Sequence, residues 1–274
     1  MLEIPEAKTI TRQMSDTLMD KRITHAIAAT SPHGFAWYSG DPAMYTGMLT
    51  GRTITGTATH GGRPELWAED MRISFGDGVN IRYIAEGAKR PAKHQLLLTF
   101  DSGDALVCTV QMYGGMWAFP AGTNDDFYYT VGVEKPNPLD DAFDAAYFAS
   151  LLTDEIRKLS AKAFLATQQR VPGLGNGVVQ DILWTAQIHP KRKMHTLSDA
   201  DFQRLFDITK TLLKDMTAKG GRNTEKDLFG QTGSYITIMS KNNTAQPCPA
   251  CGDIIKRMSY LGGNVYVCET CQSI

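Results

Sequence analysis

Hydrophobic and polar residues follow different periodicities in the two halves of the chain. Residues 6–20 place Ile10, Met14 and Leu18 at helical spacing, which predicts an amphipathic helix that begins just after Pro5. The segments that follow alternate apolar and polar positions or carry continuous apolar runs, and glycine- and aspartate-rich turns separate them. Several short strands with regular turns favour a β-sandwich or barrel. The predicted strands are RTITGTAT, MRISF, VNIRYI, HQLLLTF, ALVCTVQM and DFYYTVGV.

From residue 142 onward the apolar positions recur with helical spacing. We expect Ser198 to cap the last long helix and Gly220–Gly221 to end it. A polar loop is expected at 222–246. The chain is therefore predicted to be α+β, with an N-terminal helix and β-sandwich in 1–134, a helical unit in 135–240 that starts with the linker KPNPLDD, and a terminal module in 241–274. The predicted helices are DAFDAAYFASLL, LTDEIRKLSAKAFLATQQ, GVVQDILWTAQ and SDADFQRLFDITKTLLKDMTAK.

Composition and charge narrow the class of protein. Hydrophobic residues make up 42% of the chain and charged residues 21%, which is typical of a soluble globular protein. The amphipathic, acidic start is not a secretory signal, so we expect a cytoplasmic protein. No apolar run approaches the ~18 residues that are needed to span a bilayer, so we expect no membrane partner. We also expect a monomer. Residues 1–150 hold 12 Lys/Arg against 18 Asp/Glu, whereas residues 151–274 hold 16 against 11. This asymmetry indicates that the second half meets a polyanion, although a solvated surface would also account for it.

The cysteines predict a metal site at the end of the chain. Cys248, Cys251, Cys268 and Cys271 form two Cys-x2-Cys pairs on either side of a predicted hairpin, a spacing typical of structural Zn²⁺. The hairpin is expected to turn at Gly262-Gly263-Asn264. A redox Cys-x-x-Cys is expected as a single pair beside a βαβ unit, and four thiolates leave no open position for zinc catalysis. The fifth, Cys108, is expected to be a buried thiol.

A glycine-rich turn, VPGLGNGVV, separates two predicted helices. Gly173 and Gly175 permit a tight turn, and Asn176 is suited to cap the helix that follows. The free N–H groups of a helix start favour an anion such as phosphate. Taken alone, the segment is more typical of a plain helix–helix turn.

The turn and the cysteine module together resemble the formamidopyrimidine-DNA glycosylase/endonuclease VIII family. That family carries a helix–two-turn–helix motif with the sequence GLGN, a following IHP stretch and a terminal zinc hairpin. The start MLEIPEAKT resembles the family start Met-Pro-Glu-Leu-Pro-Glu, and KPNPLDDAF resembles its interdomain segment. The resemblance implies an N-terminal helix on a β-sandwich, a helical domain with a zinc finger, and double-stranded DNA, damaged or abasic, in the cleft between the lobes. The matching residues are Gly173, Leu174, Gly175, Asn176, Ile188, His189, Pro190, Cys271 and Gln272.

The resemblance also implies an activity, the removal of oxidised bases followed by strand cleavage, which requires flipping the nucleotide out of the stack. In the family the N-terminal proline amine attacks the sugar carbon and the next glutamate serves in acid/base roles. Carried over, Glu3 takes the glutamate position and Glu6 a supporting one. Asn176 is expected to bind backbone phosphate, and Lys162 and Gly175 are expected at the DNA interface.

Three positions depart from the family pattern. Leu2 replaces the nucleophilic proline, and a large second residue blocks removal of Met1, so the free amine would lie one residue, or about 3.3–3.6 Å, too early. A misplacement of about 1 Å can cost roughly 100-fold in rate. At the hairpin, Asn264 stands where the family presents an arginine.

The family lysine that grips the phosphates is the third departure. One register nominates Lys93; the register that we prefer puts Gly62 there. In the preferred register Met112 and Tyr113 occupy the place of the loop that fills the hole left by the flipped base, as an apolar wedge or simply as core.

These patterns leave three hypotheses. The first is a zinc-containing DNA-binding protein on the glycosylase scaffold with weak or lost catalysis. The second is an active glycosylase and AP lyase that uses the Met1 amine with Glu3. The third is an RNA-binding or protein-interaction module.

Overall fold

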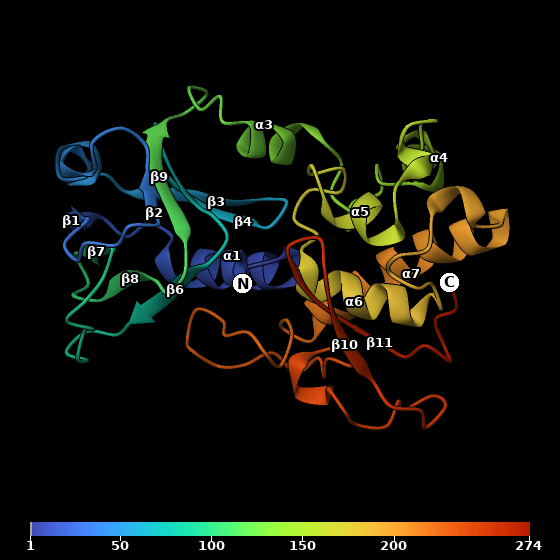
Figure 1. Ribbon diagram of the computed structural model, residues 1–274. Coiled ribbons are helices and arrows are strands. Elements are labelled where there is room, and N and C mark those ends of the chain that lie inside the picture. Colours follow the sequence, from blue (N-terminus) through green and yellow to red (C-terminus); the bar gives the residue numbers. More distant parts are fainter. Residues whose placement is uncertain (1) are drawn as a thin grey trace.

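The computed structural model describes residues 2–274 and contains two lobes joined through an N-terminal helix (Figure 1). In the first lobe two sheets face each other. One has the strand order β1-β7-β8-β6, and the other has the order β2-β9-β5-β4-β3, in which only the β2–β9 pair is parallel. The strands are β1 (Ile23–Ala28), β2 (Ala36–Tyr38), β3 (Ile54–His60), β4 (Arg63–Ala68), β5 (Met71–Phe75), β6 (Val79–Ile84), β7 (Leu96–Phe100), β8 (Ala105–Val110) and β9 (Gly114–Pro120).

The N-terminal helix α1 (Ile4–Leu18) shares its apolar side chains between the two lobes. Ile10, Met14 and Leu18 are buried in the core of the sandwich, whereas Ile4 is buried in the core of the helical lobe. The predicted helix and its apolar face are confirmed, although Pro5 lies inside the first turn. Because α1 belongs to both cores, its first residues are placed where the two lobes meet (Figure 1).

The second lobe is a cluster of helices around one apolar core. Ser198 caps the long helix α7 as predicted, and its hydroxyl accepts from the Asp201 N–H; Gly220 follows with a φ of 73°. The elements are α3 (Phe127–Glu134), which leads into the lobe, α4 (Ala145–Ser150), α5 (Ala161–Ala166), α6 (Asn176–Thr185) and α7 (Asp199–Ala218). Short 3-10 turns and one further helix complete the chain: Pro42–Met44, α2 (Tyr45–Leu49), Ile156–Lys158, Met194–Thr196 and Lys241–Asn243.

The chain ends in the antiparallel hairpin β10 (Lys256–Tyr260) and β11 (Gly263–Val267), which lies along α6. The Gln180 side chain from α6 accepts from the Tyr266 N–H at 2.6 Å. Gln272 donates to the carbonyl of Ile188 at 3.0 Å and accepts from the Cys268 N–H at 3.1 Å. These contacts fix the hairpin to the second helix of the turn motif. The limits of the three predicted units remain a prediction.

Two predicted elements were wrong in type or continuity. DFYYTVGV, predicted as a strand, is helix α3, because the Asp126 carboxylate accepts from the Tyr129 N–H and starts a helix despite the aromatic and β-branched composition. The single helix predicted over LTDEIRKLSAKAFLATQQ is interrupted: Leu159 is extended and the Ser160 hydroxyl caps a separate helix, α5.

Two details of the turns also differ from the prediction. The hairpin turns at Leu261–Gly262, whose φ values are 51° and 72°, so Asn264 lies within β11 opposite Ser259 rather than at the tip. The loop 222–246 is not uniformly polar, since Leu228, Tyr235 and Met239 are buried in it. Within residues 2–274, the helices are all too short or too polar to cross a bilayer.

Candidate functional site at the cleft between the lobes

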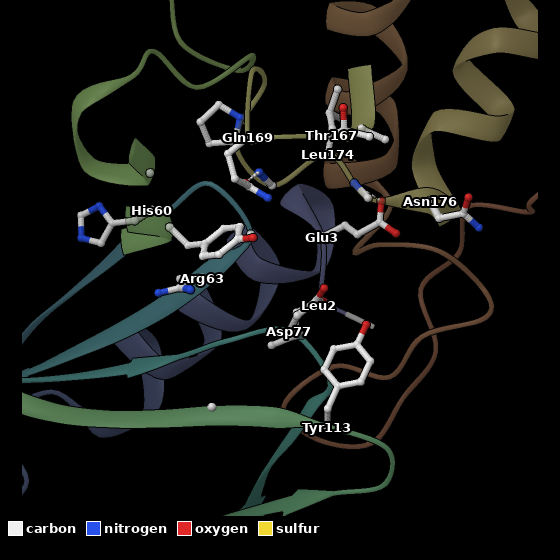
Figure 2. Close-up of a pocket in the computed structure, with 18 of the residues that line it drawn as sticks. Leu2, Glu3, His60, Arg63, Asp77, Tyr113, Thr167, Gln169, Leu174 and Asn176 are labelled. Atoms are coloured by element: carbon white, nitrogen blue, oxygen red, sulfur yellow. Dashed lines mark hydrogen bonds between the residues drawn. The ribbon is translucent and has the colours of Figure 1, made fainter. Parts of the chain in front are cut away.

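A cleft of about 880 Å³ lies where the two lobes and the hairpin meet (Figure 2). The sandwich supplies Trp37, Gly62, Arg63, Asp77, Met112, Tyr113 and Trp117, and the chain start supplies Leu2 and Glu3. The helical lobe supplies Lys162 and the glycine-rich turn, and the hairpin supplies its tip, Leu261 to Gly263. The chain start, the glycine-rich turn and the hairpin tip therefore share one cavity.

The glycine-rich turn packs directly on the β3–β4 turn of the sandwich. Gly173 has a φ of 84°, and a Cβ there would lie 2.2 Å from the Gly62 nitrogen. Only glycine permits both this backbone conformation and this approach. Gly62 lines the cleft, whereas Lys93 is exposed on the segment between β6 and β7 and is not among the lining residues. The cleft therefore has no lysine at either candidate position.

Glu3 occupies the start of helix α6. Its carboxylate accepts from the N–H groups of Gly175, Gly177 and Val178 at 2.9–3.0 Å, and only 2% of the residue is exposed. The predicted role of Asn176 as the cap was wrong, because Gly175 is the N-cap and Asn176 is the first helical residue. The anion that the helix start attracts is thus a side chain of the protein itself.

Glu6 and Arg222 complete a buried ionic cluster beside Glu3. The Arg222 guanidinium donates to both Glu6 carboxylate oxygens, at 2.8 and 3.0 Å, and to Glu3 at 3.2 Å. Burial alone would lower the pKa of Arg222, but Glu3 and Glu6 hold it above its usual value. Because Arg222 follows α7 and both glutamates belong to the start of α1, the cluster ties the chain start to the helical lobe.

Asp77 is a second acidic group in the cleft. It lies on the turn between β5 and β6, and Figure 2 shows it beside Leu2 and close to Tyr113. Its carboxyl is open to the cleft, but removal from bulk water by the cleft walls and the nearby Glu3 carboxylate raise the pKa of Asp77 to about 7. The cleft therefore holds one carboxylate fixed by hydrogen bonds and one that changes charge near neutrality.

The sandwich wall of the cleft is aromatic. Trp37 and Tyr113 lie with ring centroids 5.9 Å apart, and Met112 beside them is 73% exposed. Deeper along the wall, the Arg63 guanidinium lies 4.5 Å from the Trp117 ring centroid and is paired with Asp126 at 3.1 Å. Met112 is therefore at the surface of the cleft and not part of the core.

The opposite wall is polar and includes the remaining predicted DNA contacts. Lys162 is 4% exposed, and its ammonium donates to the Tyr260 carbonyl at 2.7 Å; burial lowers the pKa of Lys162. The Asn176 side chain donates to the Asn264 carbonyl at 3.0 Å. Asn264 itself is absent from the residues that line the cleft. Both Lys162 and Asn176 thus hold the hairpin tip against the helical lobe.

The four predicted metal ligands converge. The Sγ atoms of Cys248, Cys251, Cys268 and Cys271 all lie within 4.8 Å of one another, which is compatible with four thiolates around one zinc ion. Trp184 from α6 packs against this cluster. Cys108 is fully buried in β8, and burial raises the pKa of its thiol.

Sequence reasoning located most of this site but missed three of its residues. Asp77 and Trp37 lie in segments that carry no motif, and Arg222 was passed over inside a loop. No signal identifies Trp37 before the fold is known. For Asp77 the sequence offers only the Gly-Asp-Gly turn in which it lies. For Arg222 it offers only a positive charge between Gly221 and a polar stretch. Met1, the predicted source of the amine, lies outside the described residues.

Comparison with known proteins agrees with this arrangement. Residues 135–227 match the family model of the formamidopyrimidine-DNA glycosylase H2TH domain. The chain is 27% identical to a formamidopyrimidine-DNA glycosylase of Acidothermus cellulolyticus over 100% of its own length and 98% of that protein. It is also 27% identical to one of Streptococcus pneumoniae, over 99% of each chain.

Solved structures show the same fold. The Lactococcus lactis Fpg in complex with abasic-site DNA superposes with a TM-score of 0.85 at 23% identity, over 99% of this chain and 100% of that one. The Thermus thermophilus MutM (Fpg) protein superposes with a TM-score of 0.82 at 19% identity, over 98% of each chain. The chain thus carries an H2TH domain over residues 135–227 and, over nearly its full length, is similar in sequence and fold to formamidopyrimidine-DNA glycosylases.

Proposed function

We propose that this protein binds damaged or abasic double-stranded DNA in the cleft as a monomer, and that its glycosylase and lyase chemistry is weak or lost. The proposal rests on one observation: the chain start, the glycine-rich turn and the hairpin tip line the same cavity. In that cavity Leu2 takes the position at which the glycosylase family has its nucleophilic proline. The similar Lactococcus lactis protein has been solved on abasic-site DNA in the same fold, which supports the choice of ligand.

The two walls suit different parts of a DNA strand. The helical wall offers Lys162 and the Asn176 amide, which are donors toward phosphate oxygens. The N–H groups at the start of α6 are engaged by Glu3. Lys162 and Asn176 already donate to the Tyr260 and Asn264 carbonyls, so a phosphate would be bound by their remaining N–H groups. The sandwich wall offers Met112 and Tyr113, which suit the apolar wedge that fills the place of an extruded base.

Leu2 is the reason to expect weak chemistry. It is 9% exposed and packs into the sandwich core while also lining the cleft. With Met1 retained, as a large second residue favours, the Leu2 backbone nitrogen is an amide and cannot form the iminium that a terminal proline amine forms. Glu3, whose carboxylate accepts from three backbone N–H groups and Arg222, is better suited to positioning the chain start than to exchanging protons.

The four cysteines would hold a structural Zn²⁺. The ion would supply the folding free energy that a lone two-stranded hairpin lacks, on the order of 10 kcal/mol. The hairpin contributes its tip to the cleft, so zinc would support binding indirectly by fixing that tip against α6.

A gel-shift titration tests the proposal. A duplex with a tetrahydrofuran abasic analogue should bind more tightly than the undamaged duplex at about 50 mM salt, where phosphate contacts are strong. Asn176→Ala should weaken abasic binding by roughly 10-fold, because a hydrogen bond to a charged group contributes about 1.5–3 kcal/mol. Thr211→Ala, exposed on α7 away from the cleft, is the matched control and should leave binding unchanged. Absence of binding at low salt, or tighter binding to structured RNA, would overturn the proposal.

A further inference from the structure

We propose that Trp37, with Tyr113 beside it, forms a stacking platform for the nucleobase that loses its partner at the lesion. The inference rests on the proposed DNA binding and adds to it a subsite, a residue and the part of the DNA that the residue contacts. Trp37 lies on β2, outside every motif that carries the family resemblance.

Strand β2 points Trp37 into the cleft. β2 pairs in parallel with β9, with Ala36, Trp37 and Tyr38 opposite Gly114, Gly115 and Met116. Because side chains alternate along a strand, Ala36 and Tyr38 face one way and Trp37 the other. Ala36 and Tyr38 pack against the sandwich core, whereas Trp37 lines the cleft.

The exposure of Trp37 indicates a surface for a ligand. It is 46% exposed and lies at 36° to the Tyr113 ring, at a centroid distance of 5.9 Å. The pair thus forms a tilted aromatic surface rather than a packed core contact. The half-exposed indole and the neighbouring phenol ring together offer a ligand an apolar area that stacking would bury.

The opposite wall identifies the occupant. Lys162 and Asn176 lie across the cleft from the aromatic surface, and their donors suit the sugar–phosphate backbone. A strand whose backbone follows that wall directs its bases toward Trp37, where a base that has lost its partner can turn one face onto the indole ring. Every base has a π-face, so stacking on tryptophan is tolerant of sequence, as expected for the base that happens to lie opposite a lesion.

A fluorescent base tests the platform directly. In a duplex with 2-aminopurine opposite a tetrahydrofuran site, the wild-type protein should quench 2-aminopurine at saturation, because the base stacks on the indole. Trp37→Ala should lose this quenching and weaken binding by roughly 5- to 150-fold, the range for one base–aromatic stack. Trp37→Phe should retain most of both. Phe35→Ala is the matched control: Phe35 is 63% exposed near the same strand, is not among the residues that line the cleft, and should behave as wild type.

The outcomes separate this inference from the proposed function. If Trp37→Ala binds the abasic duplex with wild-type affinity and quenching, the platform is refuted while DNA binding stands. If Trp37→Ala weakens abasic and undamaged duplexes equally, Trp37 is a general surface contact and the platform is again refuted. If wild type binds neither duplex, both proposals fail. Thermal unfolding of each variant confirms that the sandwich is intact.

Discussion

Replacing Arg222 by methionine removes the cation from the buried cluster that joins the chain start to the helical lobe. In Arg222→Met the carboxylates of Glu3 and Glu6 stay in place with only 2% and 3% of each residue exposed. Glu3 keeps its three backbone donors and Glu6 keeps two, the backbone N–H groups of Glu3 and of position 222, but Glu6 loses both guanidinium contacts. The variant therefore leaves two buried carboxylates without the cation that pairs with them.

The expected cost follows from this geometry. Breaking a buried ion pair by removing one partner destabilises a protein by about 3–5 kcal/mol, because the remaining charge has lost its partner and cannot regain water. Total stabilities are about 5–15 kcal/mol, so the loss is a large part of the whole. The surface pair of Lys219 with Asp215, whose side chains are 47% and 44% exposed, is the matched comparison. Lys219→Met should cost about 0.5 kcal/mol or less.

Urea unfolding followed by circular dichroism measures both variants. Adding Glu6→Gln to Arg222→Met should restore part of the loss, because the second change removes the unpaired charge. The interpretation that a buried ion pair joins the chain start to the helical lobe would be refuted by either of two results. One is a decrease below about 1 kcal/mol in the free energy of unfolding of Arg222→Met, and the other is no recovery of that energy in the double variant.

Two further outcomes follow from the cleft and the hairpin. Asp77, with a pKa raised to about 7, is ionised above that pH and repels phosphate, so affinity for an abasic duplex should rise as the pH falls from 8 to 6. Glu3, Glu225, Arg222 and Arg63 are among the charged groups that act on it, and Asp77→Asn should remove the pH dependence and bind at pH 8 as wild type does at pH 6. Cys268→Ser should lower the zinc content measured by mass spectrometry and expose the hairpin to protease, because one thiolate in four is lost; unchanged zinc content would contradict the assignment.

Local patterns were sufficient to predict most of the fold. Helical spacing located α1, α6 and α7, and the paired cysteines located the hairpin. The prediction for segment 126–133 was wrong because its aromatic and β-branched residues are typical of a strand. The helix is started by a capping interaction, in which the Asp126 carboxylate accepts from the Tyr129 N–H, and amino-acid composition does not reveal such a contact. The hairpin tip was misplaced by two residues because three adjacent positions accept a positive φ.

The site was harder to predict because its decisive contacts are distant in sequence. Glu6 and Arg222 are 216 residues apart, and Glu3 reaches Gly177 across 174. The start of α6 suggested a phosphate site, and nothing in the local sequence shows that a glutamate from α1 occupies it. Trp37 becomes visible only when β2 is placed at the edge of a sheet beside the cleft.

The most direct test of the account is borohydride trapping on abasic duplex DNA at concentrations where gel shift shows saturation. Wild type should bind the duplex yet form covalent adduct about 100-fold more slowly than Leu2→Pro, in which removal of Met1 would place a proline amine at the chain start. A mass measurement of each mature N-terminus completes the comparison. If wild type traps abasic DNA as efficiently as Leu2→Pro, Leu2 does not weaken the chemistry, and the proposed weak or lost catalysis is wrong.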